Sequence, residues 1–167
     1  VDRYNDRSSV FFTGLLPLII YILMIVVPKI DPKRRSYQKH EKAYNITKII
    51  IILFSIMMHW LLIMYSLGFN INVGMFVRIA IGILFIVMGN FMGQIRQNYS
   101  FGIKTPWTLA NETVWKKTHR VGGFSFIIGG IILMASSFFN ETIGAIALIG
   151  AIVISAFYPM VYSYILY

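Results

Sequence analysis

The sequence predicts an all-α protein, a polytopic integral membrane helix bundle with five transmembrane helices in this chain. Three observations support this fold class: long apolar stretches, a low share of charged residues, and basic residues gathered in two loops. A helix needs about 20 apolar residues to cross the hydrocarbon core of a bilayer. The expected spans are residues 10–27, 49–67, 73–93, 121–139 and 143–167.

The composition supports the same class. Apolar residues make up 57% of the chain and charged residues 13%, whereas a typical soluble domain carries about 25% charged residues. The spans occupy most of the chain, which leaves no room for a soluble catalytic domain. We therefore expect residues 1–167 to form one integral membrane domain.

The formal net charge is +9, and its distribution predicts the orientation. Lysine and arginine are concentrated in residues 28–48 and 94–120, whereas the connections at 68–72 and 140–142 contain neither. Because basic loops mark the cytoplasmic side of a membrane protein, both long loops and the C-terminus are expected in the cytoplasm. This orientation accounts for the charge, so direct nucleic-acid binding is not expected. Contacts of the basic loops with anionic membrane lipids are expected instead.

The segment before the first span is polar and of mixed charge, and the chain starts with valine. It lacks the basic start and short apolar run of a signal peptide. The expectation is that a further span lies upstream, which would give six spans in the intact protein.

In the first basic loop, Asp31 and Pro32 can begin a short helix, because aspartate caps helix N-termini and proline suits the first helical position. The second loop, residues 94–120, is longer than the topology requires and carries more specialised residues. Gly102 permits backbone angles closed to other residues, and Thr108 or Asn111 can cap a helix that starts near Glu112.

That helix would place Trp115 and His119 on one face, four residues apart. Two interpretations of the second loop stay open. It can be an interfacial hairpin anchored by Trp107 and Trp115, since tryptophan favours the headgroup region, or it can be a binding surface.

The chemistry of the chain excludes several functions. There is no cysteine, and His40, His59 and His119 lie far apart in sequence, so neither a metal site nor a cofactor is expected. Every carboxylate lies outside the apolar cores, which disfavours ion-coupled transport. No nucleophile and base lie together on a span, so we do not expect an enzyme. His59 is expected to be a hydrogen-bonded packing residue.

Small residues predict close helix packing. Gly89 and Gly93 form a GxxxG motif, and Ala147, Ala151 and Ser155 recur at every fourth position. Packing within one bundle is favoured over a homodimer.

Arg78 lies near the outer end of the third span, and its guanidinium group is expected to reach the outer membrane–water interface. A second interpretation makes Arg78, Asn70 and Asn72 contacts for a peptide that arrives from outside.

A series of uncommon residues around the second loop resembles the SdpI family of bacterial membrane proteins. The residues that carry the resemblance are Asn90, Gly93, Arg96, Asn98, Gly102, Lys104, Thr105, Pro106, Trp107, Trp115, His119 and Arg120. The segment 28–32 is also similar to family members. The resemblance implies a multi-pass protein of the bacterial plasma membrane that protects its host against a secreted hydrophobic peptide toxin. It also implies toxin sensing, in which a transcriptional repressor is held at the membrane.

The expected function is therefore that of a non-enzymatic immunity or sensor protein that binds or shields an antimicrobial peptide and signals through its cytoplasmic loops. The alternative is a transporter or exporter of a small amphipathic compound. A lipid-acting membrane enzyme is the third possibility. A transporter would need a polar cavity, and one lined together by His59, Asn90 and Arg96 would favour it.

Overall fold

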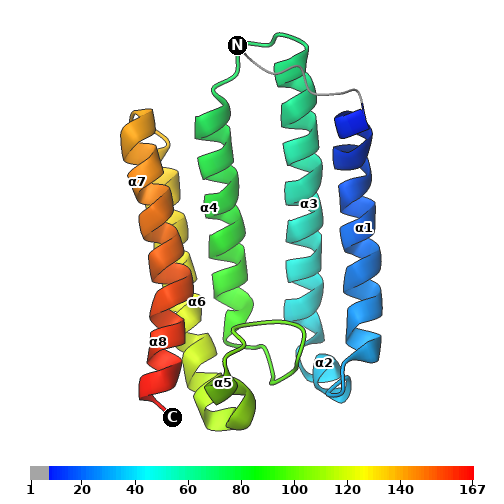
Figure 1. The fold of residues 1–167 in the computed structure, drawn as a ribbon, viewed down its shortest axis with the longest axis vertical. Coiled ribbons are helices and arrows are strands. Elements are labelled where there is room, and N and C mark those ends of the chain that lie inside the picture. The colour runs from blue at the N-terminus through cyan, green and yellow to red at the C-terminus, as the bar shows by residue number, and fades with distance from the viewer. Residues whose placement is uncertain (1–7) are drawn as a thin grey trace.

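A computed structural model describes residues 8–167, and its helices form five long parallel and antiparallel rods (Figure 1). All five are long and apolar enough to cross a membrane, which confirms the expected fold class. The described residues form no strand. The first four rods are α1 (Ser8–Ile30), α3 (Glu41–Ser66), α4 (Val73–Met92) and α6 (Glu112–Ser136), and the fifth joins α7 (Glu141–Ile152), the π-helical turn η1 (Val153–Phe157) and α8 (Tyr158–Ile165). The upstream span expected from the sequence lies outside the described residues.

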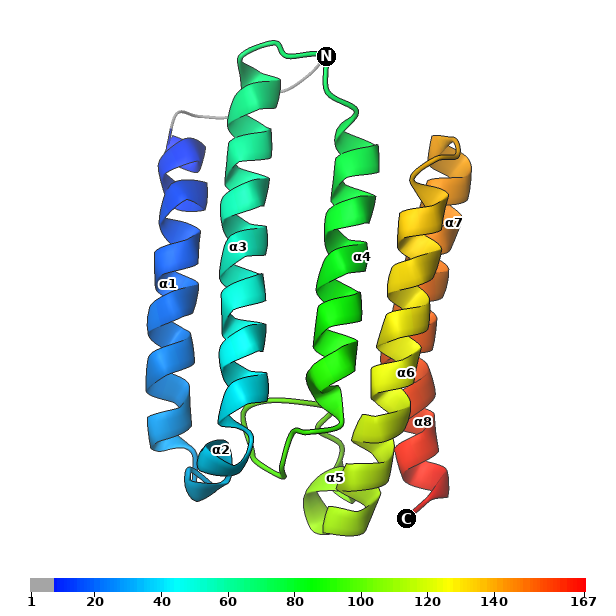
Figure 2. The ribbon, with the colours of Figure 1, turned by 180° about the vertical axis from the view of Figure 1, so that it is seen from behind.

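Helices α1, α3 and α4 stand in a row, α6 packs against α4, and the α7–α8 rod packs against α6 (Figures 1 and 2). One end of the bundle holds the short helices α2 (Arg35–Lys39) and α5 (Pro106–Ala110) and the 94–105 loop. We call this the basic end, because it carries both basic loops. The opposite end holds the connections 67–72 and 137–140. The C-terminus lies at the basic end (Figure 1).

Asparagine side chains cap the starts of α4, α6 and α7. Helix α6 begins at Glu112, where the side chain of Asn111 accepts hydrogen bonds from the backbone N–H groups of Thr113 and Val114. Asn72 and Asn140 cap α4 and α7 in the same way. The expected cap at Asp31 was wrong, since α2 begins only at Arg35. Asp31 instead organises a turn, in which its carboxylate accepts the N–H of Lys33 at 2.7 Å.

The tightest helix contact is the α4–α6 seam, where two pairs of glycines face each other. A Cβ atom added to Gly123 would lie 2.7 Å from the carbonyl oxygen of Gly89, and one added to Gly130 would lie 2.6 Å from that of Gly82. The seam therefore uses glycines seven residues apart on each helix. The predicted partner position, Gly93, is not part of it, since its nearest contact is Arg120 Cα at 4.0 Å.

Two of the three predicted small residues of the fifth rod pack inside the bundle, whereas Ala147 is only half-buried. Ala151 and Ser155 are buried, and the Ala151 carbonyl lies 3.3 Å from the position of a Cβ on Gly129 of α6. Ser155 also donates a hydrogen bond to the carbonyl of Ser125. Close approach of α6 to both α4 and the fifth rod fixes the positions of the loops at the two ends.

The orientation of the bundle can be tested with single cysteines, because the natural chain has none. Gln38 and Lys117 are exposed at the basic end, and Thr142 is exposed at the opposite end. From the positive-inside rule we expect a membrane-impermeant thiol reagent to label Thr142→Cys in intact cells. Gln38→Cys and Lys117→Cys should react only after the membrane is opened. Labelling of Gln38→Cys in intact cells would show that the protein has the opposite orientation.

Candidate functional site

Asn98 is the centre of an ordered loop at the basic end. Its side chain is fully buried, and its Oδ1 atom accepts hydrogen bonds from the backbone N–H groups of Ser100 and Phe101 and from the hydroxyl of Tyr37. Its Nδ2 atom donates to the carbonyls of Arg96 and Phe101, each at 2.9 Å. One amide therefore satisfies the backbone of a whole turn and connects it to α2.

Asp31 joins the first basic loop to the second. Its Oδ2 atom accepts hydrogen bonds from Tyr99 N at 3.0 Å, Ser100 Oγ at 2.8 Å and Tyr37 Oη at 3.2 Å. Burial raises the pKa of Asp31, but the hydrogen bonds to its carboxylate outweigh this effect and hold the pKa below its ordinary value. An ionised carboxylate at this position thus binds two loops that are separated by more than 60 residues.

His40 and Gln97 add further connections between the two loops. The backbone N–H of Arg96 donates to His40 Nδ1 at 3.2 Å. Burial and the nearby Arg96 charge lower the pKa of His40, which keeps this nitrogen free to accept. Gln97 donates to the carbonyls of Thr108 and Leu109 at 2.8 and 2.9 Å, and its Oε1 atom accepts a hydrogen bond from Lys33 Nζ.

Trp115 and His119 form the floor under the second loop. The predicted common face is confirmed, since the two rings stack with centroids 4.0 Å apart. The expected interfacial anchor at Trp115 was wrong, because the residue is fully buried and its Nε1 atom donates to the carbonyl of Ile95 at 2.8 Å. His119 Nε2 accepts the N–H of Ile103 at 3.0 Å. Gly102 passes over His119 with φ of 115°, an angle that favours glycine.

The loop is also attached to the last helix. Thr105 and Thr108 form a reciprocal capping box at the start of α5, and Thr105 Oγ1 lies 3.0 Å from Ser163 Oγ of α8. The half-buried Trp107 packs on Tyr164, with ring centroids 5.0 Å apart. The second loop is thus fixed to α2, α6 and α8, which makes it one ordered unit rather than a passive connector.

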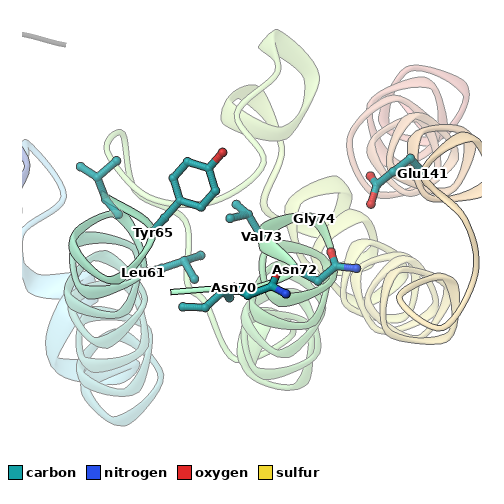
Figure 3. A pocket seen from close by; sticks show the side chains of 9 residues that line it. Leu61, Tyr65, Asn70, Asn72, Val73, Gly74 and Glu141 are labelled. Carbon is teal, nitrogen blue, oxygen red and sulfur yellow. The ribbon is translucent and has the colours of Figure 1, made fainter. Parts of the chain in front are cut away.

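The opposite end of the bundle is hollowed by a cavity of about 700 Å³ between α3, α4 and α7. Tyr65 of α3, Asn70 of the connecting loop and Glu141 of α7 face this space (Figure 3). Its remaining lining is mostly apolar, from Leu61, Leu62, Ile71, Asn72, Val73 and Gly74. The predicted outer residues Asn70 and Asn72 therefore share a cavity.

Arg78 does not reach the interface as expected. It is 6% exposed, and its Nη1 atom lies 3.2 Å from Glu141 Oε2. Gly144 of α7 lies directly against the guanidinium, and a Cβ on Gly74 would lie 2.8 Å from both Glu141 oxygens. Glycines on two helices thus make room for the ion pair that joins α4 to α7 beside the cavity. Within the described residues, Arg78 Nε and Nη2 have no hydrogen-bond partner.

Comparison with known proteins finds a family to which this chain is similar. The SdpI/YfhL protein family model matches residues 94–163, which contain the whole of the ordered second loop. A curated relative, the protein named "Immunity protein SdpI" of Bacillus subtilis (strain 168), is 30% identical over 126 residues. The chain is therefore similar to the SdpI family along most of its length. The match covers 75% of this chain and 60% of the relative. No solved structure matches the chain significantly.

The SdpI-like residues predicted from the sequence fall into three places. Arg96, Asn98, Gly102, Thr105, Pro106, Trp107, Trp115 and His119 lie in or against the ordered loop. Asn90, Gly93 and Arg120 lie together elsewhere, in a shallow pocket of about 200 Å³ on the outer surface of α4 and α6. Lys104 is exposed, and its Nζ atom donates to the carbonyl of Ser100.

Several members of these sites were not predicted as site residues. Asp31, Tyr37 and His40 complete the loop network, and Glu141 completes the cavity. The sequence carries one signal for Asp31, since it is one of only two carboxylates, with Glu41, among the seven lysines and arginines of the first loop region. The described residues contain no group of three histidine or carboxylate side chains that could hold a metal ion.

Proposed function

We propose that this chain is an immunity protein of the bacterial plasma membrane that binds a secreted, hydrophobic antimicrobial peptide without cleaving or pumping it. The observation that carries the proposal is a preformed cavity at the end of an SdpI-like bundle that lies opposite the basic loops. By the positive-inside rule this end faces outward, where a secreted peptide would arrive. The similarity to an immunity protein of Bacillus subtilis supports the same role.

The cavity has the composition of a peptide site. Leu61, Leu62 and Ile71 offer apolar contacts, and Asn70 and Tyr65 offer hydrogen bonds that would orient a backbone. Each Å² of apolar surface that a hydrophobic peptide buries there would contribute about 25 cal/mol to the free energy of binding. Capture of this kind needs neither an ion gradient nor a catalytic group.

Signalling to the cytoplasm, with a transcriptional repressor as partner, is the finer part of the proposal. Helix α4 begins at the cavity with Val73 and Gly74 and ends at Met92, against the ordered loop. The glycine seam couples α4 tightly to α6, which carries Trp115 and His119. A peptide that moves the start of α4 would therefore shift the floor of the loop at the basic end.

The transporter alternative receives less support from the geometry. His59 is hydrogen-bonded to Thr13 at 3.0 Å, Arg96 lines a pocket at the basic end, and Asn90 lines the separate pocket on α4 and α6. These three side chains share no cavity in the part of the chain that the structure describes. The lipid-acting enzyme also receives less support: the hydroxyls of Thr13 and Ser100 lie beside His59 and Asp31, but neither pair lines the pockets at the two ends of the bundle.

The proposal is tested by the survival of a sensitive host that expresses this protein, against a panel of antimicrobial peptides. We expect protection against one hydrophobic peptide, and we expect it to fail once the peptide outnumbers the protein, because capture saturates. Asn70→Leu with Tyr65→Phe should lower protection at normal protein abundance, since both changes remove groups that can hydrogen-bond a peptide in the cavity. The matched control Asn45→Leu with Tyr21→Phe changes similar groups away from it.

The same peptide should bind the purified protein in liposomes that hold no ion gradient, at about one peptide per protein. Protection that requires the gradient, with no binding in its absence, would instead establish active transport. Equal loss of protection in the cavity variant and its control would show that the cavity does not bind the peptide.

A further inference from the structure

A second pocket lies at the basic end, between α2 and the start of the second loop. Its volume is about 460 Å³, and it is lined by Lys33, Ser36, Lys39, Arg96, Gln97 and Glu112. It is separate from the cavity of the proposed function and lies at the other end of the bundle. Three of its six lining residues are cationic, and only one is acidic.

The positive charge of this pocket is only partly offset by its own lining, in which the carboxylate of Glu112 interacts with the charges of Arg96 and Lys39. Glu112 is paired with Lys116, with Nζ and Oε1 3.0 Å apart, and Lys33 donates to the neutral amide of Gln97. Among the described residues, Lys39 and Arg96 form no ion pair. Cations that share a pocket attract an anion more strongly than scattered surface charges do.

The walls of the pocket are held in place before any ligand arrives. The N–H of Arg96 is bound by His40, and the side chain of Gln97 is fixed to the carbonyls of Thr108 and Leu109. The Asp31 turn fixes Lys33 at the other side. Ser36 adds a hydroxyl to the lining. Guanidinium, ammonium and hydroxyl groups are the donors that phosphate oxygens require.

The position of the pocket identifies the source of the phosphate. Its walls lie directly beyond the ends of membrane helices, since α1 ends at Ile30, α3 begins at Glu41 and α4 ends at Met92. Figures 1 and 2 show α2 and the loop at the level where these helices end. In a bilayer crossed by these helices, this is the level of the lipid headgroups. Basic pockets at this level suit anionic headgroups, because each nearby lysine or arginine strengthens the attraction.

We propose that this pocket binds the headgroup of one anionic phospholipid, with Lys39 and Arg96 as the principal contacts to its phosphate. The bound lipid would bridge α2 and the second loop, and so would stabilise the ordered unit at the basic end. The proposal does not depend on the cavity at the opposite end or on the identity of any peptide.

The test measures retention of phosphatidylglycerol and of phosphatidylcholine by the detergent-purified full chain, with native mass spectrometry. The pocket variant carries both Lys39→Gln and Arg96→Gln. The control variant carries both Lys42→Gln and Lys117→Gln. Both pairs remove two charges from exposed residues of the basic end, but only the first lines the pocket. Thermal unfolding verifies that both variants are folded.

We expect phosphatidylglycerol to bind the natural chain more tightly than phosphatidylcholine, and to bind the pocket variant about tenfold more weakly, with little change in the control. Equal weakening in both variants would show a general effect of charge and overturn the site. Glycerol phosphate binding as tightly as the lipid would show that the pocket takes a soluble phosphate compound instead. Equal binding of the two lipids would exclude recognition of the anionic headgroup.

Discussion

Gly123→Val should prevent this protein from forming a stable bundle. The new Cβ atom would lie 2.7 Å from the carbonyl oxygen of Gly89, well inside van der Waals contact. Backbone atoms on both sides of the seam cannot rotate away as a flexible side chain can, so α4 and α6 would have to separate. Overpacking of this kind costs on the order of 3 kcal/mol, a large fraction of the stability of a small domain.

The same chain supplies a matched control for this prediction. Gly150 lies in α7 and has no atom within 4 Å of an added Cβ. Gly150→Val therefore makes the same chemical change in a helix without a clash. Thermal unfolding and size-exclusion chromatography of both variants check the prediction. If Gly123→Val elutes and melts as the natural chain does, the α4–α6 seam is not the principal contact of the bundle.

The membrane spans were predictable because their signal is local. Each long helix contains one apolar run, and a run of this length is typical of a helix that crosses a bilayer. Gly102 was predictable for a related reason, since a positive φ is a property of a single residue. The Trp115 and His119 pair follows from helical spacing alone.

The contacts between distant segments could not be predicted in this way. Asp31 has its partners at Tyr99 and Ser100, and nothing in either local sequence indicates that the two loops meet. Arg78 is expected at the interface because it lies near the outer end of its span, whereas Glu141 is brought to it by the packing of α7 on α6 and α4. Gly123 and Gly130 acquire their role only once α6 lies antiparallel to α4.

The error at Trp115 has the same origin. Tryptophan in a loop next to a span usually lies among the headgroups, and the sequence places Trp115 there. The structure shows that the 94–105 loop folds back over α6 and covers the ring, so that a residue of the expected interface becomes part of a core with Met92 and Ile95. A loop that covers a tryptophan needs its own hydrogen-bonded structure, and Asn98 and Asp31 provide it.

Trp115→Ala should consequently disorder the whole basic end. The change removes a fully buried ring, the stacking partner of His119 and the donor to the carbonyl of Ile95. Loss of a large buried aromatic side chain costs about 3–5 kcal/mol, and the carbonyl left without a partner adds to this cost. We expect faster hydrogen exchange across residues 94–105 and lower protein abundance.

Two other tryptophans calibrate this result. Trp60 is 55% exposed on α3, so Trp60→Ala should leave the exchange of the 94–105 loop unchanged. Trp107→Ala removes only the half-buried contact with Tyr164, and it should free α5 while the turn at Asn98 stays protected. The order of the three variants is the decisive measurement, because a loop that served only as a connector would respond to none of them. Unchanged exchange in Trp115→Ala would show that the hydrogen bonds of Asn98 and Asp31 hold the loop without its aromatic floor.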